Sequence, residues 1–192
     1  ISRNCRLTSF QGRVYDNPSR NLTPIGVQIK KMFNYEGFRN SAKVVWLAKE
    51  INIKSCVYCN TQYALKVKHK NKQKLLFHFD HFFPQSIYPY LSLSFYNLIP
   101  CCASCNMSKS SKPYSIAENI HPYVNSLDEY AKYQAEAASL ARFLLNINKN
   151  ENEIELQLNI RTRYVADLKI EKMLDSNLNE FKIETQYGQF KD

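Results

Sequence analysis

The chain has 192 residues, 44% of them apolar, which is enough for one substantial core or one core with a small satellite. Its 26 Lys and Arg exceed 17 Asp and Glu, and the resulting net charge of +9 favours a polyanionic partner such as nucleic acid. This composition excludes a disordered chain, and no apolar run approaches the roughly 20 residues that span a bilayer. We therefore expect a soluble, cytoplasmic protein with no membrane partner.

The first part of the chain predicts an arm followed by helices. Residues 1–23 show little periodicity, which indicates an extended N-terminal arm. From Pro24 apolar residues recur at helical spacing, and a second helix is predicted over 41–50. Together these elements make a helical lead-in over residues 24–55.

The central segment, residues 56–113, contains the motifs with the candidate metal-binding and catalytic residues. Alternation predicts a strand over Leu75–Phe79. A short helix should begin near Cys101 or Cys102 and end before Pro113, because the residue preceding proline disfavours the helical region. The segment is thus predicted as the core of an α+β fold.

The last part, residues 114–192, is predicted as a helix and strand extension that packs on the core or on a partner. A capping-box signature at Ser126 predicts a helix of about 20 residues. Strict alternation predicts a strand over 154–160, followed by a helix over 163–177 and a last strand over 181–187.

Residues 62–74 are rich in lysine and include Lys68 and Lys70. Such a charge run fits either a solvated hairpin tip or a loop that contacts phosphate. The sequence leaves both interpretations open.

Four of the six cysteines form two Cys-x-x-Cys pairs. They are Cys56, Cys59, Cys102 and Cys105. Two such turns can place four thiolates tetrahedrally around one ion, so the spacing predicts a zinc site. Four sulfurs close the coordination sphere, which makes this zinc structural. Cys5 and Cys101 remain as ordinary thiols, although Cys101 is an alternative ligand.

The residues between and after the cysteine pairs carry a resemblance to a nuclease family. In order, the chain contains Cys56-x-x-Cys59, Asp80-His81-Phe82-Phe83-Pro84, Asn97-Leu98 and Cys102-x-x-Cys105-Asn106-x-x-Lys109. This pattern resembles HNH (ββα-metal) endonucleases of the four-cysteine type. The resemblance implies a ββα-metal core that the zinc holds together, with flanking helices.

The same resemblance implies roles for individual residues. His81 would be the general base, while Asp80 and Asn106 would hold one divalent cation. Oxygen ligands favour magnesium or manganese as that cation. Asn97 would order the loop that orients His81. Because histidine ordinarily titrates near pH 6.5, activity should fall below about that pH.

The candidate nucleic-acid contacts are basic residues in and around this segment. They are Lys109, Lys112, Lys68 and Lys70. DNA is expected as the substrate in preference to RNA. The predicted site acts on a phosphodiester, which both polymers contain, so a ribonuclease, for example one that cleaves tRNA, is the alternative.

A narrower resemblance concerns residues 80–106. The sequence of this segment, with a later His-Pro-Tyr, is similar to HNH nuclease subunits of Septu-type and retron anti-phage defence systems. It implies an antiviral effector controlled by an ATPase partner. The remaining alternative is a zinc module that binds nucleic acid or a partner without catalysis.

Overall fold

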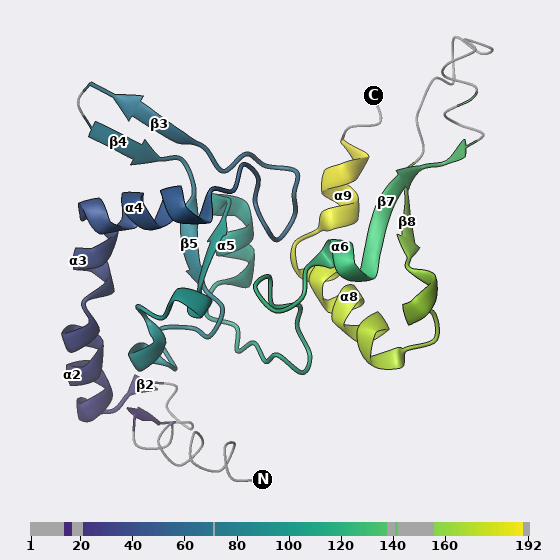
Figure 1. Ribbon diagram of the computed structural model, residues 1–192. Helices are drawn as coiled ribbons and strands as arrows, with labels where there is room; N and C mark the ends of the chain where they lie inside the picture. The colour runs from purple at the N-terminus through teal and green to yellow at the C-terminus, as the bar shows by residue number, and fades with distance from the viewer. Residues whose placement is uncertain (1–13, 17–20, 71, 138–140, 142–155, 190–192) are drawn as a thin grey trace. The chain divides into compact units, whose positions relative to one another are not determined.

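The computed structural model describes residues 14–16, 21–70, 72–137, 141 and 156–189 (Figure 1). It mixes helices and strands, in agreement with the predicted α+β class. The chain divides into two compact units, residues 1–115 and 116–192. Among the described helices, none combines the length and the apolar character needed to cross a bilayer.

The first unit is a series of helices followed by strands and one further helix. Its elements are β1 (Tyr15–Asp16), β2 (Asn21–Leu22), α2 (Pro24–Phe33), α3 (Tyr35–Arg39), α4 (Ala42–Ile51), β3 (Lys66–His69), β4 (Lys72–Leu75), β5 (His78–His81), the 3-10 turns η1 (Pro89–Leu91) and η2 (Phe95–Asn97), β6 (Leu98–Cys101) and α5 (Ala103–Lys109). The strands form three antiparallel pairs, β1 with β2, β3 with β4, and β5 with β6. The α4 helix packs beside β4 (Figure 1).

Polar side chains set the limits of the first three helices. Thr23, Asn34 and Ser41 each accept a backbone N–H from the first turn of α2, α3 and α4, respectively. Asn34 and Asn52 adopt left-handed conformations, with φ of 39° and 49°, and end α2 and α4. The two helices predicted in the lead-in are therefore confirmed.

The β5–β6 pair and the α5 helix form the centre of this unit. His78 lies opposite Cys101 and His81 opposite Leu98 in the antiparallel register. Because α5 begins two residues after β6 ends, the chain passes directly from strand to helix, as predicted near Cys102. The predicted strand Leu75–Phe79 is misplaced, since its residues fall across the end of β4, a bend and the start of β5.

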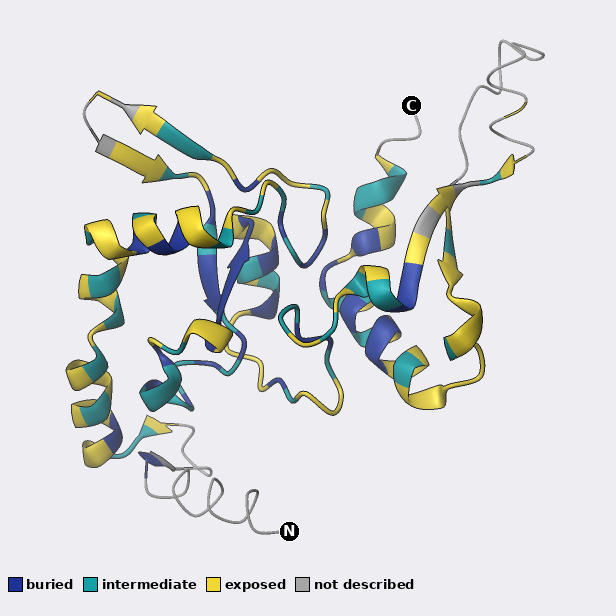
Figure 2. Cartoon of the chain, viewed as in Figure 1, coloured by how far each residue is buried: buried dark blue, intermediate teal, exposed yellow. Residues whose placement is uncertain are grey.

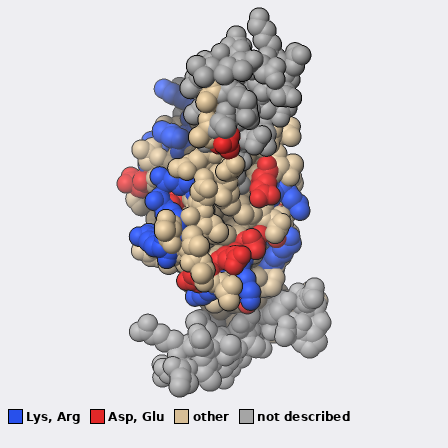
Figure 3. All heavy atoms as spheres, turned by 90° about the vertical axis from the view of Figure 1, so that its right-hand side faces the viewer, with Lys and Arg blue, Asp and Glu red and all other residues tan. Residues whose placement is uncertain are grey.

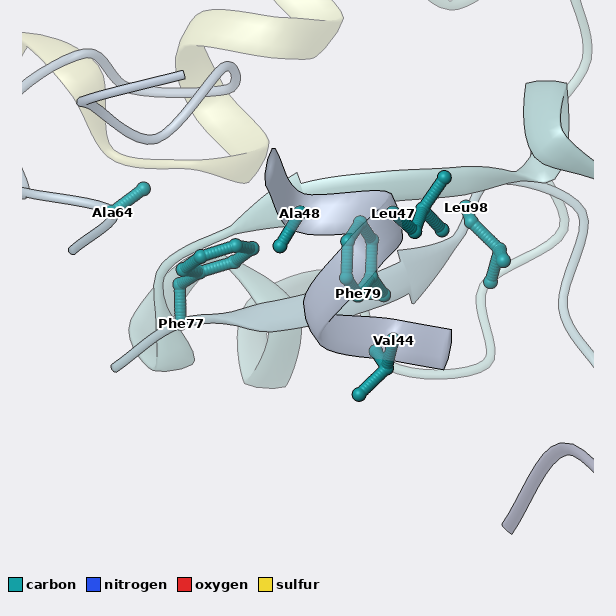
Figure 4. Close-up of a cluster of buried hydrophobic side chains, with 7 residues drawn as sticks. All are labelled: Val44, Leu47, Ala48, Ala64, Phe77, Phe79 and Leu98. Carbon is teal, nitrogen blue, oxygen red and sulfur yellow. The ribbon is translucent and has the colours of Figure 1, made fainter. Parts of the chain in front are cut away.

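An apolar cluster holds α4 against β5 and β6 (Figure 4). Its buried members are Val44, Leu47, Ala48, Ala64, Phe77, Phe79 and Leu98. The three α4 residues lie three and four positions apart, so they form one helix face. In Figure 2 that face is dark blue, as are β5 and β6, while the opposite face of α4 is exposed. Burial of this cluster therefore fixes the position of β5 against α4.

The second unit contains a strand pair and two principal helices. Its elements are α6 (Leu127–Tyr130), β7 (Ala131–Ala135), β8 (Leu156–Ile160), η3 (Thr162–Tyr164), α8 (Leu168–Glu180) and α9 (Ile183–Gly188). β7 pairs antiparallel with β8, with Ala131 opposite Ile160. Met173 and Leu174 of α8 pack against Tyr130 in a separate apolar cluster. This unit thus has a core of its own.

Two sequence-based expectations are wrong in this unit. The helix of about 20 residues predicted from Ser126 is interrupted after four residues, because the chain turns into β7 at Ala131, and most of the predicted helix beyond β7 lies outside the described residues. The strand predicted over 181–187 is instead α9, which follows a left-handed Lys182 with φ of 51°.

The other two predicted elements are confirmed in part. Residues 156–160 of the predicted 154–160 strand form β8, and residues 154 and 155 lie outside the described residues. The helix predicted over 163–177 begins later, at Leu168, because the Asp167 carboxylate caps its first turn.

Candidate metal centre and cleft

The two predicted cysteine pairs come together in one cluster. The sulfurs of Cys56, Cys59, Cys102 and Cys105 all lie within 4.8 Å of one another, and all four residues are buried. Four sulfurs held about 2.3 Å from one ion lie roughly 3.8 Å apart in a tetrahedron, so the cluster suits a structural zinc ion. Cys101 is a separate buried thiol in β6, and Cys5 lies outside the described residues.

Local hydrogen bonds position these thiols. The Cys102 sulfur caps α5 by accepting the Cys105 N–H at 3.4 Å, and Thr61 Oγ1 donates to the Cys59 sulfur at 3.1 Å. Hydrogen bonds from Cys105 and Cys56 lower the pKa of Cys59, while the pKa values of Cys56 and Cys105 are raised, so without a metal the negative charge is concentrated on Cys59. Metal binding requires thiolates, so an ion in this cluster would displace the shared protons.

A cleft lies beside this cluster, between β5, α5 and the α3 helix. It has a volume of about 540 Å³, and its lining includes Tyr35, His78, Asp80, His81 and Asn106. Three of the four residues predicted for catalysis thus border one cavity. The fourth, Asn97, is buried behind it, with an exposed fraction of 2%.

His81 is fixed at the end of β5 by one hydrogen bond and one ring contact. Its Nε2 lies 3.0 Å from the Ser92 carbonyl oxygen, and the Tyr35 ring packs edge-on at 4.4 Å between centroids. A carbonyl oxygen only accepts, so Nε2 carries the proton and Nδ1 retains a lone pair in the neutral ring. Desolvation lowers the pKa of His81 and keeps this neutral form at pH 7.

Asn97 ties together the loop that follows His81. Its Oδ1 accepts the Phe83 N–H at 2.7 Å, and its Nδ2 donates to the carbonyl oxygens of Phe83 and Leu91 at 3.1 and 3.0 Å. All of the donor and acceptor groups of this buried amide are thus used by backbone. Asn97 is a positioning residue, because its side chain holds the loop and does not border the cleft.

Asp80 and Lys109 form a buried ion pair, which corrects the role expected for Lys109. Lys109 Nζ lies 3.1 Å from Asp80 Oδ2 and donates to the His81 carbonyl oxygen at 2.7 Å. Tyr58 donates its hydroxyl to Asp80 Oδ2, also at 2.7 Å. The Lys109 side chain has an exposed fraction of 0%, so it holds Asp80 and the end of β5 and does not contact phosphate.

Asn106 lies against His78 and not against the expected Asp80. Asn106 Nδ2 is 3.1 Å from His78 Nδ1, with both residues half-buried at the cleft. Desolvation, followed by the charge of Arg39, lowers the pKa of His78, which keeps its ring neutral. The Asp80–Asn106 metal pair stays a prediction: both residues line the cleft, with Asn106 in contact with His78 and Asp80 engaged by Lys109 and Tyr58.

Sequence reasoning missed His78 as a site residue. Strand alternation showed that His78 shares a face with Asp80, but it gave no partner for the ring. Arg39 was also missed, because only the tertiary packing of α3 brings it near His78. The one available signal was the spacing of His78, two residues before Asp80.

The other predicted basic contacts lie on exposed positions. Lys68 is on β3, Lys70 follows it in a left-handed turn with φ of 54°, and Lys112 follows α5. β3 and β4 form an antiparallel hairpin that carries Lys68 and Lys70. On the face of the molecule in Figure 3, basic and acidic side chains are interspersed, so the positive charge is not gathered there.

Comparisons of the chain with models of protein families, with curated proteins and with solved structures found no match.

Proposed function

We propose that this chain is a metal-dependent HNH endonuclease that hydrolyses phosphodiester bonds in DNA. The observation that supports it most is the placement of His81, with its Nδ1 lone pair, in one cleft with the His78–Asn106 pair. The motif order from Cys56 to Lys109 supports the same assignment.

The residues of the cleft have distinct parts in the proposed hydrolysis. Phosphodiester hydrolysis requires a base for the attacking water and positive charge near the phosphate. The Nδ1 atom of neutral His81 takes the proton from water, while the Ser92 carbonyl holds the ring. Asn97 and Lys109 act indirectly, since each binds backbone next to His81.

A divalent cation would be held by Asn106 and His78, with Asp80 lining the same cleft. When bound, the ion supplies positive charge for the phosphate oxygens. The 3.1 Å contact between Asn106 Nδ2 and His78 Nδ1 is a hydrogen bond, so the two side chains meet at one point of the cleft. With the amide turned so that Oδ1 faces the ion, they would offer it one oxygen and one nitrogen ligand. The nitrogen donor extends the expected choice of magnesium or manganese towards transition metals such as nickel and cobalt.

The test is cleavage of plasmid DNA and, separately, of total RNA by the wild type and His81→Ala. Each reaction is run with EDTA, magnesium or manganese. We expect the wild type to cut DNA with metal only and His81→Ala to lose at least about a hundredfold in rate. Zinc content and thermal unfolding of both proteins serve as controls for folding.

Each alternative has its own outcome in this experiment. Cleavage of RNA alone would replace the DNA assignment with a ribonuclease. Equal cleavage by the wild type and His81→Ala would contradict the role of His81. Nucleic-acid binding without cleavage under any metal, both alone and with the ATPase partner, would favour a non-catalytic zinc module.

We further propose that the nuclease is the effector of an anti-phage defence system. Support for this comes from the resemblance of residues 80–106 to the nuclease subunits of such systems. The proposal predicts that the wild type, expressed with its ATPase partner, lowers phage plaque counts and that His81→Ala does not. Equal plaque counts for both would contradict a nuclease effector in defence.

A further inference from the structure

The cleft continues into two further cavities along α3, α4 and β4. A cavity of about 610 Å³ shares Tyr35, Arg39, His78 and Phe79 with the cleft, so the two adjoin. A third, of about 560 Å³, shares Asn40, Ser41, Val45 and Gln73 with the second. The shared residues place the three cavities in a row that leads away from His81, and this row is called the groove below.

The groove is lined by positive charge. Arg39 stands at the junction of the first two cavities, Lys74 lines the second and Lys49 lines the third, and all three are exposed. Neither the second nor the third cavity has an acidic residue in its lining. The cleft has only Asp80, whose charge Lys109 neutralises. The groove therefore suits a polyanion.

A second stripe of α4 forms the wall of the third cavity. Trp46 and Lys49 lie three residues apart on the exposed face of α4, while the half-buried Val45 also packs against the core cluster. Trp46 is 62% exposed, although its indole is the largest apolar group on the helix. A large exposed ring beside lysine, on a positively charged groove, is the arrangement that stacks nucleic-acid bases.

We propose that this groove binds an unpaired stretch of the substrate strand, running from His81 to Trp46. Arg39 binds the phosphate next to the cleavage position, Lys74 and Lys49 contact later phosphates, and Trp46 stacks on a base. An indole can stack in this way only on a base that is not enclosed in a duplex. The inference rests on the proposed nuclease function and adds the form of its substrate.

Trp46 supplies its own probe, because it is the sole tryptophan of the chain. Single-stranded oligothymidylate is added to zinc-loaded His81→Ala without magnesium or manganese, and tryptophan emission is followed. In parallel, the anisotropy of a labelled oligothymidylate reports the dissociation constant. We expect quenching of Trp46 on binding, with a blunt-ended duplex of equal length quenching much less.

Variants assign the contribution of each residue in the same background. Arg39→Ala and Trp46→Ala should each weaken binding about tenfold, and Trp46→Phe should retain most of the affinity. Arg39→Ala should also lower the salt slope by about 0.7. Lys43→Ala is the matched control, since Lys43 is exposed on α4 but lines none of the three cavities.

The outcomes separate this inference from the proposed catalysis. Oligothymidylate binding without quenching, equal effects of Arg39→Ala and Lys43→Ala, or no binding at all would overturn the groove. The last result would leave Trp46 as a contact for a protein partner. Quenching in His81→Ala, together with a wild type that is inactive with and without its ATPase partner, would support the groove and reject the nuclease.

Discussion

Lys109 Nζ lies 3.1 Å from Asp80 Oδ2, and the Lys109 side chain has no solvent-exposed surface. An ion pair without solvent is stable only while both partners are present, because either charge alone is costly to bury. This pair joins α5 to β5 and, through the His81 carbonyl, reaches the proposed base.

Lys109→Met should therefore destabilise the protein strongly. Removing one partner of a buried pair typically costs about 3–5 kcal/mol, since the other charge is left uncompensated. Urea unfolding measures the change, and Lys112→Met is the control because Lys112 is exposed. Equal unfolding midpoints for the two variants would contradict a structural role for Lys109.

Alanine substitution of two neighbouring cysteines should show which thiols bind the metal. We expect Cys102→Ala to lose bound zinc and to unfold at lower temperature, because Cys102 belongs to the sulfur cluster. Cys101→Ala should retain one zinc ion per chain, although Cys101 is equally buried in β6. Metal analysis of both purified variants decides the matter. Zinc loss in Cys101→Ala with retention in Cys102→Ala would reverse the ligand assignment.

The pH dependence of cleavage should reflect the environment of His81. A base acts when neutral, and desolvation lowers the pKa of His81 from its ordinary 6.5. Activity should therefore persist below pH 6.5 and fall only at lower pH, which revises the expectation from the sequence. The measurement is kcat/KM from about pH 5 to pH 8, with circular dichroism to verify folding. An acid limb at or above pH 6.5 would contradict the prediction.

Alanine substitution should affect mainly the stability of the protein at Asn97 and mainly the rate of cleavage at Asn106. Asn97→Ala removes three hydrogen bonds to buried backbone and should lower the free energy of unfolding by about 1–3 kcal/mol. Asn106→Ala should abolish most cleavage while changing that free energy by less than about 1 kcal/mol, since Asn106 is half-buried at the cleft. Denaturant unfolding and cleavage rates are measured on both variants. A large stability loss for Asn106→Ala alone would refute this division of roles.

Local signals in the sequence predicted α2, α4, α5 and the sulfur cluster well. Caps such as Thr23 and Ser41, and the spacing of Cys102 and Cys105, act within a few residues, so they can be read without tertiary structure. The same applies to α5, whose start and end follow from its neighbours in the chain.

Non-local contacts account for the expectations that failed. Residues 131–135 continue a helical pattern, but pairing with residues 156–160 places them in a strand. Lys109 looks like a surface lysine in the sequence, and only the fold places it beside Asp80. Likewise, the distance between Asn106 and His78 depends on how α5 packs on β5.

Cys105 and Asn106 are consecutive residues on α5, and Cys102 forms its N-cap. The sulfur cluster and the cleft therefore share one helical turn. Soft cations that compete for thiolates would act on these cysteines. Displacement of the zinc would loosen the turn and move Asn106, so such a cation could silence the cleft without binding any residue that lines it.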